Sequence, residues 1–135
     1  MKAVRVRGLF VLSLTCALLG FGYVDELPPL VDAAKNADWD AVAYLLGQGD
    51  DVNAATADGT TALHWAAYWD DLAGAELLIR AGADARVAND LGATPLWNAV
   101  LNGSAAMVRG LLGAGADPDA ALILGETVLM TAART

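Results

Sequence analysis

One short pattern occurs four times in this chain at a constant step of 33 residues. The copies are DELPPLVDAA (25–34), DGTTALHWAA (58–67), LGATPLWNAV (91–100) and LGETVLMTAA (124–133). The segments after them align at the same step: AVAYLLGQGDDVN (41–53), GAELLIRAGADAR (74–86) and MVRGLLGAGADPD (107–119). Many matched positions at one period indicate a repeat protein, in which stacked units bury one another's apolar faces.

The residues of each unit predict two helices. Thr61, Thr94 and Thr127 stand just before an apolar stretch, where a hydroxyl group caps the first helical N–H groups. Pro29 and Pro95 follow this position by one residue, where a missing N–H costs nothing. In the second half of each unit, apolar residues recur at the i, i+1, i+4, i+5 spacing of one buried helical stripe. A glycine follows each stripe at C-cap distance: Gly49, Gly82 and Gly115.

The start of the second unit, TALHWAA (61–67), and the finish of the third, LLGAGAD (111–117), resemble the ankyrin repeat. The resemblance covers about residues 25–135. It implies an all-α solenoid of helix-turn-helix units joined by extended, β-hairpin-like fingers. We expect this domain to span 23–135, with units at about 25–57, 58–90 and 91–123 and a partial unit at 124–135. Because the last unit stops after its first helix, we expect the N-terminal piece of a longer repeat protein, or otherwise a last helix that frays.

The N-terminal segment predicts export. Lys2, Arg5 and Arg7 precede 17 uncharged residues, from Gly8 to Val24. A basic start, an apolar stretch and small residues at its end are typical of a signal peptide, here 1–22. The alternative is an uncut anchor over 8–24, because 17 helical residues reach about 25 Å. We therefore expect a periplasmic or extracellular protein, or, in the alternative, one attached to the inner membrane by this segment alone.

The charge balance and the scarcity of reactive residues limit the function. The chain has 16 acidic and eight basic residues, three of the basic ones in the predicted signal peptide. Such a surface repels nucleic acid and anionic lipid. The one cysteine, Cys16, lies in that segment too, which leaves no disulfide or thiol catalysis. His64 is the only histidine, whereas a zinc site needs three or four ligands and a catalytic histidine needs a nearby nucleophile. We expect no enzyme, cofactor, metal or small-molecule substrate.

The acidic pairs at 38–40, 50–51, 70–71 and 117–119 lack the spacing of a calcium-binding loop. The resemblance implies instead that Asp51, Asp84 and Asp117 serve the turns of the repeat. It also implies that His64 holds the loop between units by hydrogen bonds near the helix start.

Three aromatic residues form the most distinctive feature of the second unit. Trp65, Tyr68 and Trp69 follow helical spacing but stand two residues out of step with the apolar core positions, so they face the other side of the helix. The corresponding positions in the other units are mostly polar. Three large rings on a solvated face favour an interaction site. The alternative is that the rings pack on one another or under the neighbouring finger.

In the ankyrin-like arrangement this face lines a concave groove, which implies a protein partner of unknown identity. We expect Trp65, Tyr68 and Trp69 to be anchors. The same face is predicted to continue through four residues of the third unit: Trp97, Asn98, Leu101 and Asn102. Finger-tip residues predicted to supply polar contacts are Asp58, Asn89 and Asp90. A recruiting segment of a longer enzyme and a purely structural element are the competing hypotheses.

Overall fold

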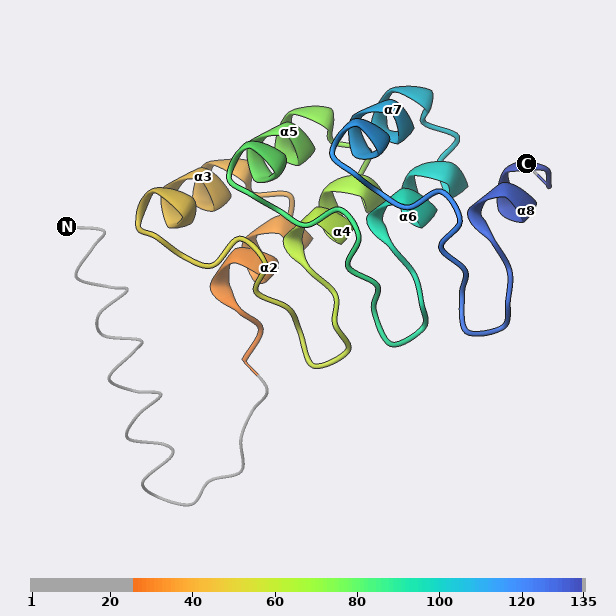
Figure 1. Ribbon diagram of the computed structural model, residues 1–135. Helices are drawn as coiled ribbons and strands as arrows, with labels where there is room; N and C mark the ends of the chain where they lie inside the picture. The colour runs from red at the N-terminus through yellow and green to blue at the C-terminus, as the bar shows by residue number, and fades with distance from the viewer. Residues whose placement is uncertain (1–25, 135) are drawn as a thin grey trace, which may run out of the picture.

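The computed structural model describes residues 26–134 as two rows of short helices (Figure 1). The inner row contains α2 (Pro29–Lys35), α4 (Ala62–Tyr68), α6 (Pro95–Leu101) and α8 (Val128–Ala132). The outer row contains α3 (Trp39–Gly47), α5 (Leu72–Arg80) and α7 (Ala105–Gly113). Within each row, consecutive helices start 33 residues apart. The predicted all-α solenoid of helix-turn-helix units is thereby confirmed.

The predicted signal peptide or anchor, 1–22 or 8–24, lies outside the described residues. None of the helices in the described part of the chain has both the length and the apolar character needed to span a bilayer.

Threonine side chains cap the inner helices α6 and α8 as predicted. Thr94 Oγ1 accepts the N–H of Trp97, and Thr127 Oγ1 accepts the N–H of Met130, both at 3.3 Å. At the start of α4 the arrangement differs, since the N–H of Thr61 donates to Nδ1 of His64 at 3.1 Å. These bonds satisfy N–H groups that have no partner inside the helix.

Aspartates of the acidic pairs are used by the fold itself. Asp38 and Asp71 cap the outer helices α3 and α5, because each carboxylate accepts the N–H three residues on. Asp51, Asp84 and Asp117 each accept the N–H two residues on at 2.9 Å, as expected for turn residues. Within residues 26–134, no three or more His, Cys, Asp or Glu side chains group closely enough to hold a metal ion.

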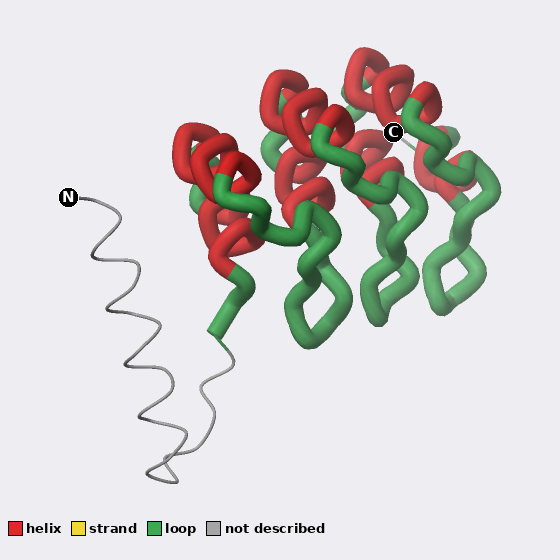
Figure 2. The backbone as a smooth tube through the Cα atoms, turned by 60° about the vertical axis from the view of Figure 1, so that its left-hand side comes forward, coloured by secondary structure: helices red, strands yellow, loops and turns green. Residues whose placement is uncertain are grey.

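A finger projects between consecutive units, and the fingers stand side by side below the helices (Figures 1 and 2). Each is a tight turn with at most a single β-bridge, such as that between Ala55 and Thr61. Neighbouring fingers are joined through their main chains, since the N–H of Asp90 donates to the carbonyl oxygen of Asp58 at 2.8 Å. Gly92 permits such an approach, because its φ is +81° and a Cβ there would lie 2.9 Å from Cα of Leu122.

The core lies between the two rows of helices. Leu30, Leu63 and Leu96 occupy the same position in the first three inner helices and are 1% exposed. The inner helices α2, α4 and α6 each pack against their own outer helix and against the inner helices beside them. At α8 this order stops within the described residues, because Leu129, in the same position, is 76% exposed.

Candidate functional site

The aromatic cluster consists of Trp65 and Tyr68 on α4 and of Trp69 directly after it. We use the name groove face for the side of the inner helices on which Trp65 and Tyr68 line a pocket together with finger residues. The rings of Trp65 and Tyr68 meet edge to face with centroids 5.5 Å apart, and those of Tyr68 and Trp69 do so at 5.0 Å. Tyr68 is 54% exposed and Trp69 49%, whereas Trp65 is half-buried. The cluster therefore presents aromatic surface to solvent while part of it rests on the core.

One member of the cluster also joins two units. Nε1 of Trp69 donates to the carbonyl oxygen of Lys35, at the end of α2, at 3.2 Å. Asn102 occupies the same position one unit later, and its Nδ2 donates to the carbonyl oxygens of Ala67 and Tyr68 at 2.9 Å. Trp69 and Asn102 thus both tie an inner helix to the preceding one.

Trp65 makes no such bond. The residue 33 positions later, Asn98, donates from Nδ2 to the carbonyl oxygen of His64 at 3.1 Å. Nε1 of Trp65 is buried yet has no hydrogen-bond partner among the described residues. A buried donor without a partner costs about 1–3 kcal/mol. Trp65 is therefore not explained by the hydrogen bonding that joins the units.

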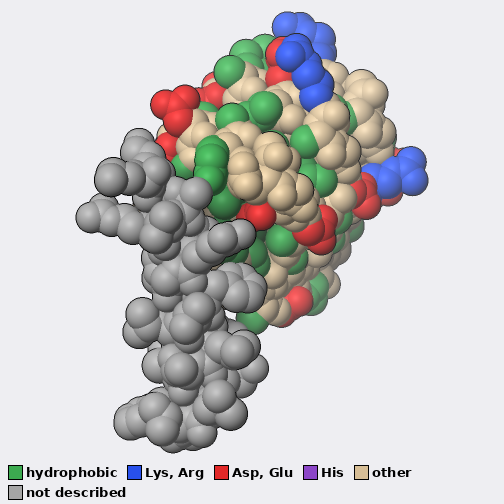
Figure 3. Space-filling model, turned by 90° about the vertical axis from the view of Figure 1, so that its left-hand side faces the viewer, with side chains coloured by type: hydrophobic (Ala, Val, Ile, Leu, Met, Phe, Trp, Pro, Cys, Tyr) green, Lys and Arg blue, Asp and Glu red, His purple; other side chains and the backbone are tan. Residues whose placement is uncertain are grey.

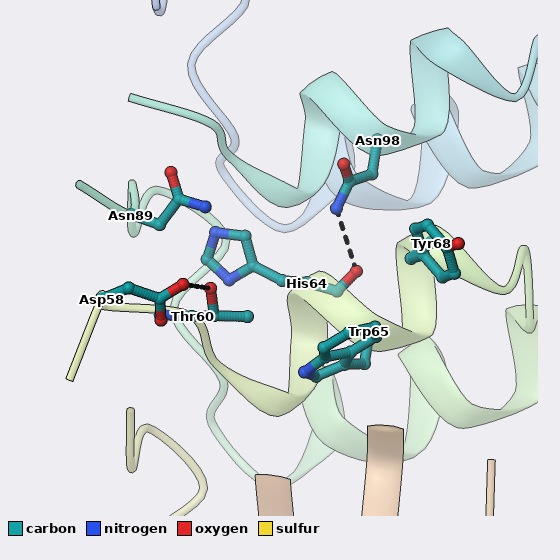
Figure 4. A pocket seen from close by; sticks show the side chains of 7 residues that line it. All are labelled: Asp58, Thr60, His64, Trp65, Tyr68, Asn89 and Asn98. Atoms are coloured by element: carbon teal, nitrogen blue, oxygen red, sulfur yellow. Dashed lines mark hydrogen bonds between the residues drawn. The ribbon is translucent and has the colours of Figure 1, made fainter. Parts of the chain in front are cut away.

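A pocket of about 290 Å³ opens on the groove face between the second and third units (Figure 4). Its lining residues come from two fingers and two inner helices: Asp58, Thr60, His64, Trp65, Tyr68, Asn89 and Asn98. The pocket combines one carboxylate, two aromatic rings and two amides.

Asp58 is held in place by the finger to which it belongs. Its Oδ1 accepts the hydroxyl of Thr56 and, at 3.1 Å, the N–H of Thr60, and its Oδ2 accepts the Thr60 hydroxyl at 3.1 Å. These hydrogen bonds, chiefly the one from Thr56, lower the pKa of Asp58 below its ordinary value. The carboxylate is therefore ionised and oriented at neutral pH.

His64 is buried and fully engaged. Its Nε2 lies 3.0 Å from the carbonyl oxygen of Ala93, which can only accept, so the proton is on Nε2. Nδ1 then accepts the N–H of Thr61. Burial lowers the pKa of His64, against the opposing effects of the Ala93 bond and of Asp58. The imidazole is neutral at pH 7, and its predicted role of holding the loop between units is confirmed.

The prediction that Trp97 extends the exposed aromatic surface is wrong. Its side chain is only 8% exposed and belongs to the core. The reason is its place in the repeat, which is that of Val31 and His64, 0% and 2% exposed. The repeat therefore buries this position, and Trp97 packs in the core instead of on the exposed surface.

The other predicted site residues divide between the pocket and its surroundings. Asn89 and Asn98 line the pocket; Oδ1 of Asn89 also accepts the N–H of Ala93 at 3.0 Å, which shapes its finger. Leu101 is 53% exposed, and Asp90 is exposed at the finger tip. Sequence reasoning missed Thr60 as a pocket residue. The available signal in the sequence was the position of Thr60, a hydroxyl residue directly before the predicted cap Thr61.

The described surface is predominantly acidic. At the end of the stack that carries α2 and α3, acidic side chains are spread over the visible face and basic ones stand at its rim (Figure 3). Two ion pairs join described residues, Arg80 with Glu76 and Arg134 with Glu126, and both lie outside the pocket. The carboxylate of Asp58 therefore has no cationic partner within the described residues.

Comparison with protein families agrees with this architecture. A family model described as ankyrin repeats, in three copies, matches the chain over residues 3–89 and again over 30–122. Together the two matches span most of the sequence. The chain belongs to the ankyrin-repeat family.

Proposed function

We propose that this chain is an exported, non-catalytic module that binds a protein partner on its groove face, with Trp65, Tyr68 and Trp69 as the main anchors. Ankyrin repeats suggest a protein–protein interaction module, and domains of this kind are typically non-catalytic. The export part of the proposal rests on the basic and apolar N-terminal segment.

The observation that carries the binding proposal is the half-exposed aromatic cluster. Tyr68 and Trp69 remain about half exposed although they pack on each other edge to face. Aromatic side chains bury about 150–250 Å² each and dominate the energetic centres of interfaces. The first unit has Lys35 and Asn36 where the second has Tyr68 and Trp69, so the repeat itself does not require rings there.

The way in which the units are joined supports a rigid surface. Main-chain hydrogen bonds connect adjacent fingers, and side chains such as Asn102 connect adjacent inner helices. A surface that is already ordered loses less entropy when a partner binds. The partner would therefore meet a preformed groove face.

The alternative is that the cluster only strengthens the stack, and the Trp69 bond to Lys35 favours this for Trp69. Tyr68 separates the two hypotheses, because its hydroxyl makes no hydrogen bond to the described residues and its ring is the most exposed of the three. Tyr44, on the outer helix α3, is a matched control because it is 46% exposed and lies away from the groove face.

The test is affinity capture from the exported fraction of the source cells with the wild-type protein, Tyr68→Ala and Tyr44→Ala, followed by titration of each retained protein. We expect Tyr68→Ala to lose the partner and Tyr44→Ala to retain it. The melting temperature of Tyr68→Ala should fall only slightly, through loss of its edge-to-face contacts with Trp65 and Trp69. Retention by Tyr68→Ala would contradict binding through the groove face. A large loss of its thermal stability would indicate the structural alternative.

Export has a separate test. The protein recovered outside the cytoplasm should begin at Tyr23 by N-terminal sequencing, with an intact mass to match. Recovery with Met1 still present would contradict cleavage and favour the anchor.

A further inference from the structure

We infer that the pocket on the groove face receives a lysine or arginine side chain of the partner, with Asp58 as its counter-charge and Trp65 and Tyr68 as its aromatic wall. This inference rests on the proposed function and specifies the chemistry of the segment that the groove face binds.

The size of the pocket suits a single side chain. Its volume of about 290 Å³ is just below the range of roughly 300–1,000 Å³ that is typical of ligand pockets. In Figure 4, Asp58 and Thr60 lie at one end, Tyr68 at the other, and Trp65 between them along α4. An extended side chain can therefore place its head near the finger and its stem along the rings.

The lining of the pocket is negative. Asp58 is its only carboxylate, and the bonds from Thr56 and Thr60 keep that group ionised and fixed in direction. Oδ2 accepts a bond from the Thr60 hydroxyl alone, so it has capacity for a further donor. His64 is neutral and its ring nitrogens are engaged, so it contributes no opposing charge.

The aromatic wall favours the same ligand. A cation within about 6 Å of a ring centroid is attracted to the ring face. Nζ of Lys35 already lies over the Trp65 ring, 5.9 Å from its centroid, so a basic side chain of the partner competes with Lys35 at this ring and meets no such competitor among the described residues at Asp58. Oδ1 of Asn98 is a further acceptor, because this amide donates to His64 through Nδ2 and its oxygen points away from His64 in Figure 4.

Other side chains fit the pocket less well. A carboxylate or phosphate would be repelled by Asp58, and an apolar side chain would desolvate that carboxylate without pairing it. A basic side chain forms a charge-assisted hydrogen bond with Asp58 while its alkyl stem covers the rings. The excess of 16 acidic over eight basic residues also steers a basic partner toward this protein.

The test is selection of short random peptides on the purified wild-type protein, followed by affinity measurements on synthetic peptides. We expect the selected peptides to share a lysine or arginine whose replacement by glutamine weakens binding at least about tenfold. Asp58→Asn should cause a similar loss, and no further loss should follow when both changes are combined. Asp40→Asn, at an exposed position of the outer helix α3 and outside the pocket, should change affinity less than about twofold.

The NMR resonances of backbone amides and the salt dependence of peptide affinity distinguish the possible outcomes. Peptides that shift the resonances of Trp65 and Tyr68 but need no basic residue, and bind Asp58→Asn equally, would overturn this inference and leave the proposed function standing. Absence of any peptide bound at the groove face would overturn both. Should Asp58→Asn fail to fold, the wild-type protein decides: affinity that does not weaken between about 0.05 M and 0.5 M salt overturns the inference.

Discussion

Nε2 of His64 donates a hydrogen bond to the carbonyl oxygen of Ala93 at 3.0 Å, and this bond joins α4 to the finger of the following unit. Because burial lowers the pKa of His64 below its ordinary 6.5, the unfolded chain binds a proton at pH values where the folded chain does not. The free energy of unfolding therefore falls as the pH drops below about 6.5. Above that pH the stability contributed by the buried, neutral His64 is fully present.

We expect the free energy of unfolding of the wild-type protein to fall as the pH is lowered from 7.5 to 5. His64 contributes a slope of at most about 1.4 kcal/mol per pH unit. Asp58 does not contribute in this window, because its pKa lies below its ordinary 3.8. His64→Gln should be less stable at pH 7.5 but show a flatter pH profile, measured by urea unfolding at each pH. Equal slopes for the two proteins would contradict a buried neutral imidazole.

A methyl group added at Gly74 should destabilise the stack. The added Cβ would lie 2.7 Å from the ring of Trp39, a residue of the preceding outer helix α3. We expect Gly74→Ala to lower the free energy of unfolding by about 1–3 kcal/mol, as overpacked cores do. Gly110→Ala is the matched control, since nothing lies within 4 Å of its Cβ, and it should gain about 0.4–1 kcal/mol. Urea unfolding curves that shift equally for both variants would refute the contact with Trp39.

Asn102 should stabilise the junction between the second and third units. Its Nδ2 donates to two carbonyl oxygens of the preceding inner helix, those of Ala67 and Tyr68. We expect Asn102→Ala to lower the free energy of unfolding by about 1 kcal/mol. Asn36→Ala, at the same position of the first unit, should cost less, because Asn36 bonds only within its own helix, to Asp32. Thermal unfolding of the two variants side by side would check this order.

Features that depend on local spacing could be predicted from the sequence. The caps at Thr94 and Thr127 follow from neighbouring residues, the period of 33 residues follows from the repeated pattern, and the turn role of Asp84 was implied by the resemblance to ankyrin repeats; the structure confirms all three. The caps and the turn are predictable because their hydrogen bonds join residues two or three positions apart.

Features that depend on contacts between units were not predictable in the same way. Helical spacing placed Trp65 on the solvated side of α4, yet the ring is half-buried and packs against the core. For Trp97 the alignment with the apolar Val31 indicated a core position, but a tryptophan one unit after His64 was interpreted as an extension of the aromatic cluster. The pocket needs residues of two units together, Asp58 and Asn98 among them, which no single repeat reveals.

The helix α8 should be the least protected of the inner helices. It has five residues, and within the described chain it packs on α6 without an outer helix beside it. Leu129 and Met130 are 76% and 57% exposed, whereas Leu96 and Trp97, one unit earlier, are 1% and 8% exposed. Because local opening is governed by buried apolar contacts, we expect the amides of α8 to exchange far faster than the amides of residues 96–101 in α6, as measured by hydrogen-exchange mass spectrometry. Equal protection in the two helices would mean that something beyond the described contacts covers Leu129 and Met130.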